Sequence, residues 1–303
     1  MEILITGGAG FIGSHLAACM INLGHNVILC DLPGKFSQHH LDTYNTVECD
    51  VSDFSQVSHL PRVDAIYHLA AQVGTASSLK NVHKDLSWNA HGTLNITQFA
   101  IDTGVSVFVY ASSMAVYGNV LNALETSQVD PISPYGISKM CGEQYVKYAQ
   151  SKSHKMRCTT FRIFNCYGPG QSTKNLTQSL ASIFLEQVKS GNKVDVTGSL
   201  SRRRDLIYIN DVIDALKMPL DDEEMMGTFN LCSGEKTSIQ SLIELIIKVS
   251  KKDPNIFTVT NTGGIPEDPH DSGGDNSKLR KLGWDTVVPL EAGLKICWDD
   301  MNE

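Results

Sequence analysis

The segment TGGAGFIG, residues 6–13, joins a short apolar stretch, Glu2–Thr6, to a stretch with helical periodicity, Phe11–Leu23. Glycines there allow a tight turn and let a pyrophosphate approach the backbone, while the start of the helix supplies N–H donors and the positive end of its dipole. The segment therefore predicts the strand–loop–helix unit of a dinucleotide-binding sheet. The residues expected to contact the dinucleotide are Gly7, Gly10, Phe11, Ile12 and Gly13.

A second apolar stretch, Asn26–Cys30, predicts the next strand and leads to Asp31, which lies 18 positions after Gly13. A carboxylate at the end of that strand accepts hydrogen bonds from the adenosine ribose and repels a 2′-phosphate. Asp31 therefore favours NAD over NADP as the cofactor, although Lys35 nearby is a small counter-argument.

Short β-branched stretches alternate with amphipathic ones along the first half of the chain. This alternation is typical of a parallel sheet with helices on both faces, and right-handed crossovers then give an α/β, doubly wound sheet of the Rossmann type. Further strands are expected at Thr46–Cys49, Ala65–Leu69, Val107–Ala111 and Arg157–Phe164, and helices at Lys84–Thr103 and Pro134–Gln150.

The pattern changes near residue 165, where loops rich in Gly, Ser and Asn separate the remaining elements. We expect residues 1–165 to form an NAD-binding domain, rejoined by residues 207–235 through a helix and a strand. Residues 166–206 and 236–303 then form a smaller α/β substrate-binding lobe. The elements expected after residue 165 are Leu176–Ser190, Val194–Thr197, Asp211–Leu220, Thr228–Leu231, Ile239–Val249 and Phe257–Thr260.

Composition and charge exclude several classes of protein. The formal net charge is −8 and no basic block occurs, so no nucleic-acid partner is expected. No apolar run approaches the roughly 20 residues that span a bilayer, and the amino terminus does not resemble a signal peptide. We therefore expect a cytoplasmic protein without a membrane partner. The eight cysteines are scattered without metal-ligand spacing, so no metal site is expected.

Other predicted element boundaries carry candidate cofactor contacts. Asp50-Val51 follows the third strand, where the carboxylate can reach an adenine amine or, nearly as well, cap the next helix. Leu69-Ala70-Ala71 ends the fourth strand with small side chains that let the backbone touch the cofactor. Asn89 is a poor helix former inside a predicted helix, and we expect it to pin a loop near the nicotinamide.

Tyr135 and Lys139 are four positions apart in a predicted helix and so share one face. An ammonium beside a phenol stabilises the phenolate and lowers its pKa from about 10, and the positive charge of NAD⁺ acts in the same direction. The phenolate can then remove a hydroxyl proton while hydride leaves the carbon, and return it later. Ser112 and Ser113 follow the fifth strand at the same sheet edge, where a hydroxyl can bridge the phenol and a substrate oxygen. We expect Ser113 to make this bridge and Ser112 to contact the cofactor.

An ordered set of motifs resembles the extended short-chain dehydrogenase/reductase family, and within it the nucleotide-sugar epimerase and dehydratase group, most like the UDP-glucose 4-epimerase type. The resemblance runs almost end to end. Its motifs are TGGAGFIGSHL at 6–16, HLAAQ at 68–72, SSMAVYG at 112–118, YGISK at 135–139, RIFNCYGPG at 162–170, RRDLIYINDV at 203–212 and DNSKLRKLGW at 275–284.

The resemblance implies that Tyr135 is the general base, Lys139 its partner and ribose clamp, and Ser113 the residue that binds the substrate hydroxyl. It implies a nucleotide-sugar 4-epimerase, on a UDP-sugar, that passes through a 4-keto intermediate with bound NAD. The family's 4,6-dehydratases carry an Asp-Glu pair at the positions of Met114 and Ala115. Neither Met114 nor Ala115 can transfer a proton, which argues against 4,6-dehydration. An NAD(P)-dependent nucleotide-sugar reductase or a non-standard dehydratase is the alternative, and an NAD(H)-sensing binding protein a minor one.

On the substrate side, the resemblance places Asn165, Asn175 and Arg204 at the diphosphate and nucleotide. Arg204 is one of three consecutive arginines, so a solvated surface position is the alternative. Glu267 is a departure, because family members commonly carry a diphosphate-binding Arg in this segment. The resemblance also implies a homodimer that pairs the helices near 84–103 and 134–150.

Overall fold

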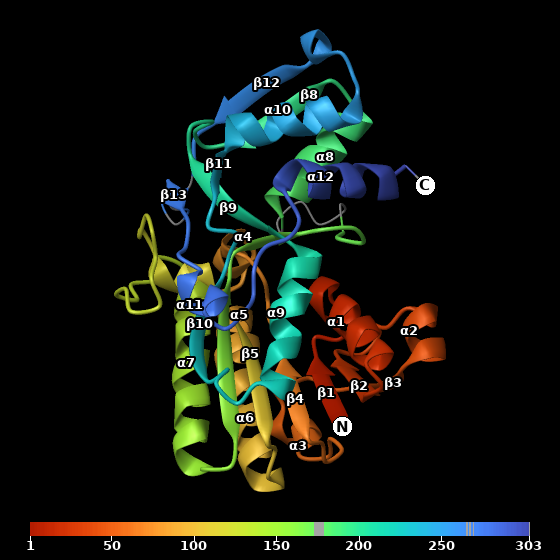
Figure 1. The fold of residues 1–303 in the computed structure, drawn as a ribbon, viewed down its shortest axis with the longest axis vertical. Coiled ribbons are helices and arrows are strands. Elements are labelled where there is room, and N and C mark those ends of the chain that lie inside the picture. The colour runs from red at the N-terminus through yellow and green to blue at the C-terminus, as the bar shows by residue number, and fades with distance from the viewer. Residues whose placement is uncertain (173–178, 265, 267, 269, 303) are drawn as a thin grey trace.

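A seven-stranded parallel sheet organises the larger part of the molecule (Figure 1). The computed structural model describes all residues except 173–178, 265, 267, 269 and 303. The strand order is β10-β6-β5-β4-β1-β2-β3, and it reverses between β4 and β1, which confirms the predicted doubly wound α/β sheet. The strands are β1 (Glu2–Thr6), β2 (Asn26–Asp31), β3 (Asn45–Glu48), β4 (Ala65–His68), β5 (Val107–Ser113), β6 (Arg157–Ile163) and β10 (Gly227–Leu231).

Helices cover both faces of this sheet. Helices α1 and α9 pack over Ile3 and Ile5 on one face, while α6 and α7 belong to the core around Leu4 on the other. Burial on both faces explains why these strands are continuous apolar runs. The helices of this part are α1 (Phe11–Asn22), α2 (Gln38–Thr43), α3 (Phe54–Val57), α4 (Thr75–Lys80), α5 (Val82–Asp85), α6 (Gly92–Thr103), the short 3₁₀ turn η2 (Met114–Tyr117), α7 (Pro134–Lys152) and α9 (Ile209–Asp221).

A smaller lobe of short strands and amphipathic helices occupies the upper part of Figure 1. It adjoins the carboxyl edge of the large sheet, because β7 starts two residues after β6 and pairs with β9 of the lobe. Helix α10 shows the helical period clearly, with buried side chains at Ile239, Leu242, Ile243, Ile246 and Ile247. The remaining elements are β7 (Asn165–Tyr167), α8 (Leu180–Ser190), β8 (Lys193–Thr197), β9 (Arg203–Tyr208), β11 (Lys236–Ser238), α10 (Ile239–Ser250), η3 (Pro254–Ile256), β12 (Thr258–Thr262), β13 (Asp271–Ser272), α11 (Ser277–Arg280) and α12 (Leu290–Asp300).

The helix predicted over Lys84–Thr103 is interrupted in the structure. A π-helical turn, η1 (Leu86–His91), lies between α5 and α6 and contains Asn89. Such turns are rare in proteins, and those that occur often lie at functional sites. Within the ranges that the structure describes, no helix is both long and apolar enough to cross a membrane.

Candidate active site

The glycine loop between β1 and α1 leaves no room for side chains at two positions. Gly7 has φ +71°, and a Cβ added there would lie 2.8 Å from the Ala70 nitrogen. A Cβ on Gly13 would collide with the Gly7 carbonyl oxygen, which also accepts a hydrogen bond from the Gly10 N–H at 3.0 Å. The loop therefore presents bare backbone at the amino end of α1, as a bound pyrophosphate requires.

Asp31 stands at the end of β2, beside this loop. Its Oδ2 accepts a hydrogen bond from the Ala9 N–H at 3.0 Å, and its Oδ1 accepts one from the Leu32 N–H at 2.8 Å. The side chain is partly exposed, as are Phe11 and Ile12 at the start of α1. Each carboxylate oxygen can accept a further hydrogen bond, so the group fits the hydroxyls of an adenosine ribose.

Asp50 forms a local turn after β3. Its Oδ1 accepts hydrogen bonds from the Ser52 N–H at 2.9 Å and the Ser52 hydroxyl at 2.7 Å, while Asp53 caps α3. The neighbouring Val51 is buried, and its carbonyl accepts a hydrogen bond from Asn95 at 2.9 Å. The geometry thus gives Asp50 a turn-forming role, and its contact with adenine stays a prediction.

A chain of hydrogen bonds through buried His68 links the glycine-loop strand to the helix that carries Asn89. On one side of the ring, Thr6 Oγ1 accepts a hydrogen bond from the Ala70 N–H and lies 2.7 Å from His68 Nδ1. On the other side, His68 Nε2 lies 3.0 Å from Thr93 Oγ1. The Thr93 hydroxyl donates to the Asn89 carbonyl. Each hydroxyl has one proton, so this order assigns the imidazole proton to Nε2. Burial lowers the pKa of His68 to about 3, which keeps the ring neutral.

Asn89 pins the loop after β4 to the start of α7. Its Oδ1 accepts a hydrogen bond from the Gln72 N–H at 2.7 Å. Its Nδ2 lies 3.0 Å from both the Gln72 carbonyl oxygen and Ser138 Oγ, and 3.1 Å from Asp85 Oδ1. The loop held in this way follows directly on Leu69–Ala71. Asn89 therefore holds this loop in place through hydrogen bonds. Its position beside a nicotinamide stays a prediction.

Tyr135 and Lys139 are buried in the first half of α7, and Ser113 lies at the end of β5. A hydrogen bond connects the Ser113 hydroxyl to the Tyr135 phenol. Lys139 Nζ lies 4.6 Å from the centroid of the Tyr110 ring, over its face. The structure thus brings Ser113 and Tyr135 together where the carboxyl edge of the sheet meets α7, and Lys139 follows one helical turn after Tyr135.

The sequence predicted that Lys139 and the charge of NAD⁺ lower the pKa of Tyr135. For the protein without a bound cofactor, this prediction is wrong. Burial raises the pKa of Tyr135 to about 12, and the hydrogen bond from Ser113 lowers it by less. Burial also lowers the pKa of Lys139 to about 8. Desolvation opposes both charged forms, and this effect cannot be seen from the spacing of two residues on a helix.

Ser112 points into a buried polar network beneath Ser113. Its hydroxyl donates to Glu143 Oε1 at 2.6 Å, and Glu143 also accepts hydrogen bonds from Arg162 Nε at 2.8 Å and Nη2 at 2.7 Å. The Arg162 guanidinium stacks on the Tyr117 ring at 4.6 Å. The network joins β5, α7, β6 and η2, and so fixes the position of the strand end that carries Ser113.

Asn165 lies on β7, close to the residue after Ser113. Its Nδ2 donates to the Asp205 carbonyl at 2.7 Å and lies 3.7 Å from the Met114 sulfur. Met114 therefore lies where the large sheet meets the smaller lobe. Asn175 and Glu267 lie outside the residues that the structure describes.

Arg204 is buried on β9 and belongs to a charged cluster of the smaller lobe. Its Nη2 lies 2.7 Å from Asp268 Oδ1, and its Nη1 donates to the His270 carbonyl at 3.0 Å. Arg202 pairs with the other oxygen of Asp268, and its Nε is buried without a hydrogen-bond partner in the described part of the chain. Burial excludes the alternative of a solvated Arg204. Two guanidinium groups thus share one carboxylate.

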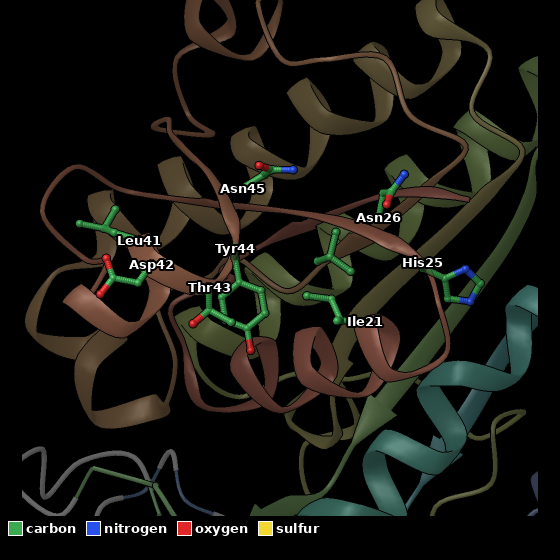
Figure 2. A pocket seen from close by; sticks show the side chains of 9 residues that line it. Ile21, His25, Asn26, Leu41, Asp42, Thr43, Tyr44 and Asn45 are labelled. Carbon is green, nitrogen blue, oxygen red and sulfur yellow. The ribbon is translucent and has the colours of Figure 1, made fainter.

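The structure also contains a surface hollow of about 390 Å³ between α1, β2 and the end of α2 (Figure 2). Ile21, Asn26 and Tyr44 line it. Asn26 is the first residue of β2, so the hollow lies at the amino end of the sheet, opposite the edge that carries Ser113. Ligands of doubly wound sheets bind at the carboxyl edge, and we assign no role to this hollow.

The glycine loop, the acid after β2 and the Ser–Tyr–Lys set define a dinucleotide-dependent enzyme of the doubly wound α/β class. The chain belongs to the NAD dependent epimerase/dehydratase family, whose model matches residues 3–232. This membership confirms the predicted family and the predicted cofactor, NAD.

Known proteins resemble the chain over nearly its whole length. A putative UDP-glucose 4-epimerase of Methanocaldococcus jannaschii is 29% identical, over 97% of this chain and 96% of its own length. A UDP-glucose 4-epimerase of Thermotoga maritima, solved with UDP-glucose, is 30% identical with a TM-score of 0.92, covering 100% and 99% of the two chains. The Thermus thermophilus enzyme, solved with NAD, is 27% identical with a TM-score of 0.92 over the same shares. Other relatives, at 28% and 30% identity, are named as a reductase and a decarboxylase.

Proposed function

We propose that this enzyme is an NAD-dependent 4-epimerase of a nucleotide sugar, most simply a UDP-sugar. The observation that carries the proposal is the contact between Ser113 and Tyr135 beside buried Lys139, followed directly by Met114 and Ala115. Neither of the last two side chains can transfer a proton, so the site lacks the pair that 4,6-dehydration requires. A UDP-glucose epimerase among its similar proteins supports the nucleotide and the reaction.

In this proposal, Tyr135 removes the proton of the sugar 4-hydroxyl and later returns it. Ser113 donates a hydrogen bond to the reacting oxygen and holds it against the phenol. Lys139 stabilises the phenolate from the same helix face. NAD, when bound, supplies the acceptor and later the donor of the C4 hydride. Return of the hydride to the opposite face of the sugar would invert C4, and because the hydride is returned, the reaction has no net redox change.

We also propose that the two parts of the chain bind different ligands. Residues 1–165, with 207–235, bind NAD through the glycine loop, Asp31 and the backbone after β4. Residues 166–206 and 236–303 bind the nucleotide sugar, with Asn165 and Asn175 at its diphosphate. Arg204, which pairs with Asp268 as Arg202 does, is the residue of this lobe that we propose to hold the diphosphate.

The test is incubation of the protein with UDP-, GDP-, CDP- and dTDP-sugars, with products followed by NMR. We expect inversion at C4 of at least one sugar without consumption of added NAD(P)H. Tyr135→Phe should lower kcat by at least about 10³-fold with an unchanged fold by circular dichroism, because the base is lost. Turnover that consumes stoichiometric NAD(P)H would instead assign a reductase.

We further propose a homodimer built on α5, η1, α6 and α7. Leu86 and Ile137 are 56% and 50% exposed, and Tyr148 lies on the same stripe of α7 as Ile137. An exposed apolar stripe of this kind is typical of a helix–helix interface. Light scattering should give a molar mass twice that of one chain. The Ile137→Glu variant should have the molar mass of a single chain.

A further inference from the structure

Tyr110 is a buried aromatic residue of β5 that the mechanism above does not use. Its side chain is fully buried where β5 packs against α7. Lys139 Nζ lies 4.6 Å from the centroid of its ring, over the ring face, and Lys139 is itself buried. Among the described residues, this ammonium forms no hydrogen bond or ion pair. A ring face attracts a cation more strongly when both are removed from water, so it gives this charge part of what hydration would provide.

The Tyr110 ring has a fixed partner on the neighbouring strand. His68 and Tyr110 are direct partners in the parallel register of β4 and β5, and their rings stack with centroids 5.8 Å apart and an interplanar angle of 21°. Thr6 and Thr93 hold the imidazole at its two nitrogens. Because the imidazole is neutral, it orders the Tyr110 ring without placing a second positive charge near Lys139.

A glycine on α7 brings the helix close to this ring. Gly142 follows Lys139 by three positions and so lies on the same side of the helix. A Cβ at position 142 would collide with the Tyr110 hydroxyl, which lies 3.4 Å from the Lys139 carbonyl oxygen. The missing side chain therefore lets α7 approach β5 at the turn that places the ammonium over the ring.

The ionisable groups around Lys139 act in both directions. Burial lowers the pKa of Lys139 to about 8, while Asp85 on α5 and Glu143 on α7 favour its charge. Glu143 is already paired with Arg162, and burial keeps Tyr135 protonated by raising its pKa to about 12. The remaining ionisable side chains on the helices packed against α7 are exposed, where solvent screens their fields. They are Lys80 on α4, His83 and Lys84 on α5, His91 on η1 and Asp102 on α6.

An interaction of modest size decides the charge of Lys139 under these conditions. A lysine with a pKa of about 8 is about nine-tenths charged at about pH 7, and a pKa lower by about one unit would leave it about half charged. A desolvated cation–ring contact has the free energy of about one such unit.

We propose that Tyr110 is a positioning residue for Lys139: its ring face keeps the buried ammonium charged and in place, and the stack with His68 fixes the ring. The inference rests on the proposed function only in taking Lys139 as the partner of Tyr135. The cation–ring contact itself does not depend on which sugar reacts.

The test is an NMR pH titration of the protein labelled in its lysine side chains, in which Lys139→Met identifies the Lys139 signal. Tyr110→Leu should lower the titration midpoint of Lys139 by about one pH unit, a tenfold change in the ratio of charged to neutral amine. Tyr110→Phe keeps the ring and should restore most of the midpoint. Trp298→Leu removes a ring that faces Lys252 at 6.0 Å in the smaller lobe, and it should not move the Lys139 midpoint.

A second pair of variants separates the charge of the ring face from simple packing. Phenylalanine with a fully fluorinated ring at position 110 has nearly the shape of phenylalanine, but its face no longer attracts a cation. It should lower the Lys139 midpoint as Tyr110→Leu does, whether or not the leucine variant folds. Equal midpoints with the fluorinated and the ordinary ring would overturn the proposal. Because no nucleotide sugar is present, failure of the epimerase assignment would show in the sugar panel and not in this titration.

Discussion

Glu143 is buried inside α7, where it holds the Arg162 guanidinium at two points and accepts the Ser112 hydroxyl. Loss of one partner from such a pair leaves an uncompensated buried charge. Glu143→Gln should therefore lower the free energy of unfolding by about 3–5 kcal/mol, measured by urea denaturation. The matched control is Glu291→Gln, which removes one side of an exposed ion pair with Lys248 and should cost no more than about 1 kcal/mol. Equal effects of the two substitutions would contradict the assigned role.

The positions of the three candidate catalytic residues could be predicted because each of them occurs in a local motif. Tyr135 and Lys139 share a helix turn, and Ser113 ends a recognisable strand. Glu143 and Asp85 could not be predicted in the same way, because acids among other polar helix residues indicate a solvated face. Only the packing of α7 against β6 and η1 buries them. The effect of burial on the pKa of Tyr135 was missed for the same reason.

The glycine loop depends on the approach of backbone to backbone at the start of α1. A Cβ at position 13 would collide with the Gly7 carbonyl oxygen, so either the loop or the helix must move. Gly13→Ala should weaken NAD binding by about tenfold or more, since overpacking costs about 1–3 kcal/mol. Isothermal titration calorimetry with NAD measures this. Gly191→Ala, where a Cβ meets no atom within 4 Å, should bind NAD normally, and a loss of affinity there would sink the argument.

Elements with strong periodicity were predicted to within a few residues. Strand β1 and helix α7 are examples, because apolar burial dictates their sequence pattern. The three-residue strand β7 and the two-residue β13 carry too few side chains to show a pattern. The π-turn η1 also escaped prediction, since one extra residue in a turn leaves the apolar spacing around it almost unchanged.

The stability of the whole molecule should depend on pH through His68. The ring has a pKa of about 3 in the folded protein and an ordinary value of about 6.5 in the unfolded chain. Above pH 6.5 neither state binds the proton, so the contribution of the neutral ring is complete. As the pH falls from 6.5 towards 3, the unfolded chain takes up a proton that the folded protein refuses. Stability is then lost by about 1.4 kcal/mol for each pH unit.

This loss can be separated from that of the carboxylates. Asp53 and Asp271 have pKa values lowered from 3.8, so their contributions are lost only below about pH 4. Burial raises the pKa values of Asp85, Asp205 and Asp211, so these groups act against the histidine slope as the pH falls, and the comparison with His68→Asn isolates the imidazole. Urea denaturation at several pH values between 4 and 6.5 should show the slope in the wild type, and His68→Asn should flatten it even though it also removes two hydrogen bonds. His40→Asn, at a more exposed histidine whose pKa is also lowered by burial, should keep most of the slope. A slope unchanged in His68→Asn would show that the imidazole is not the group that resists protonation.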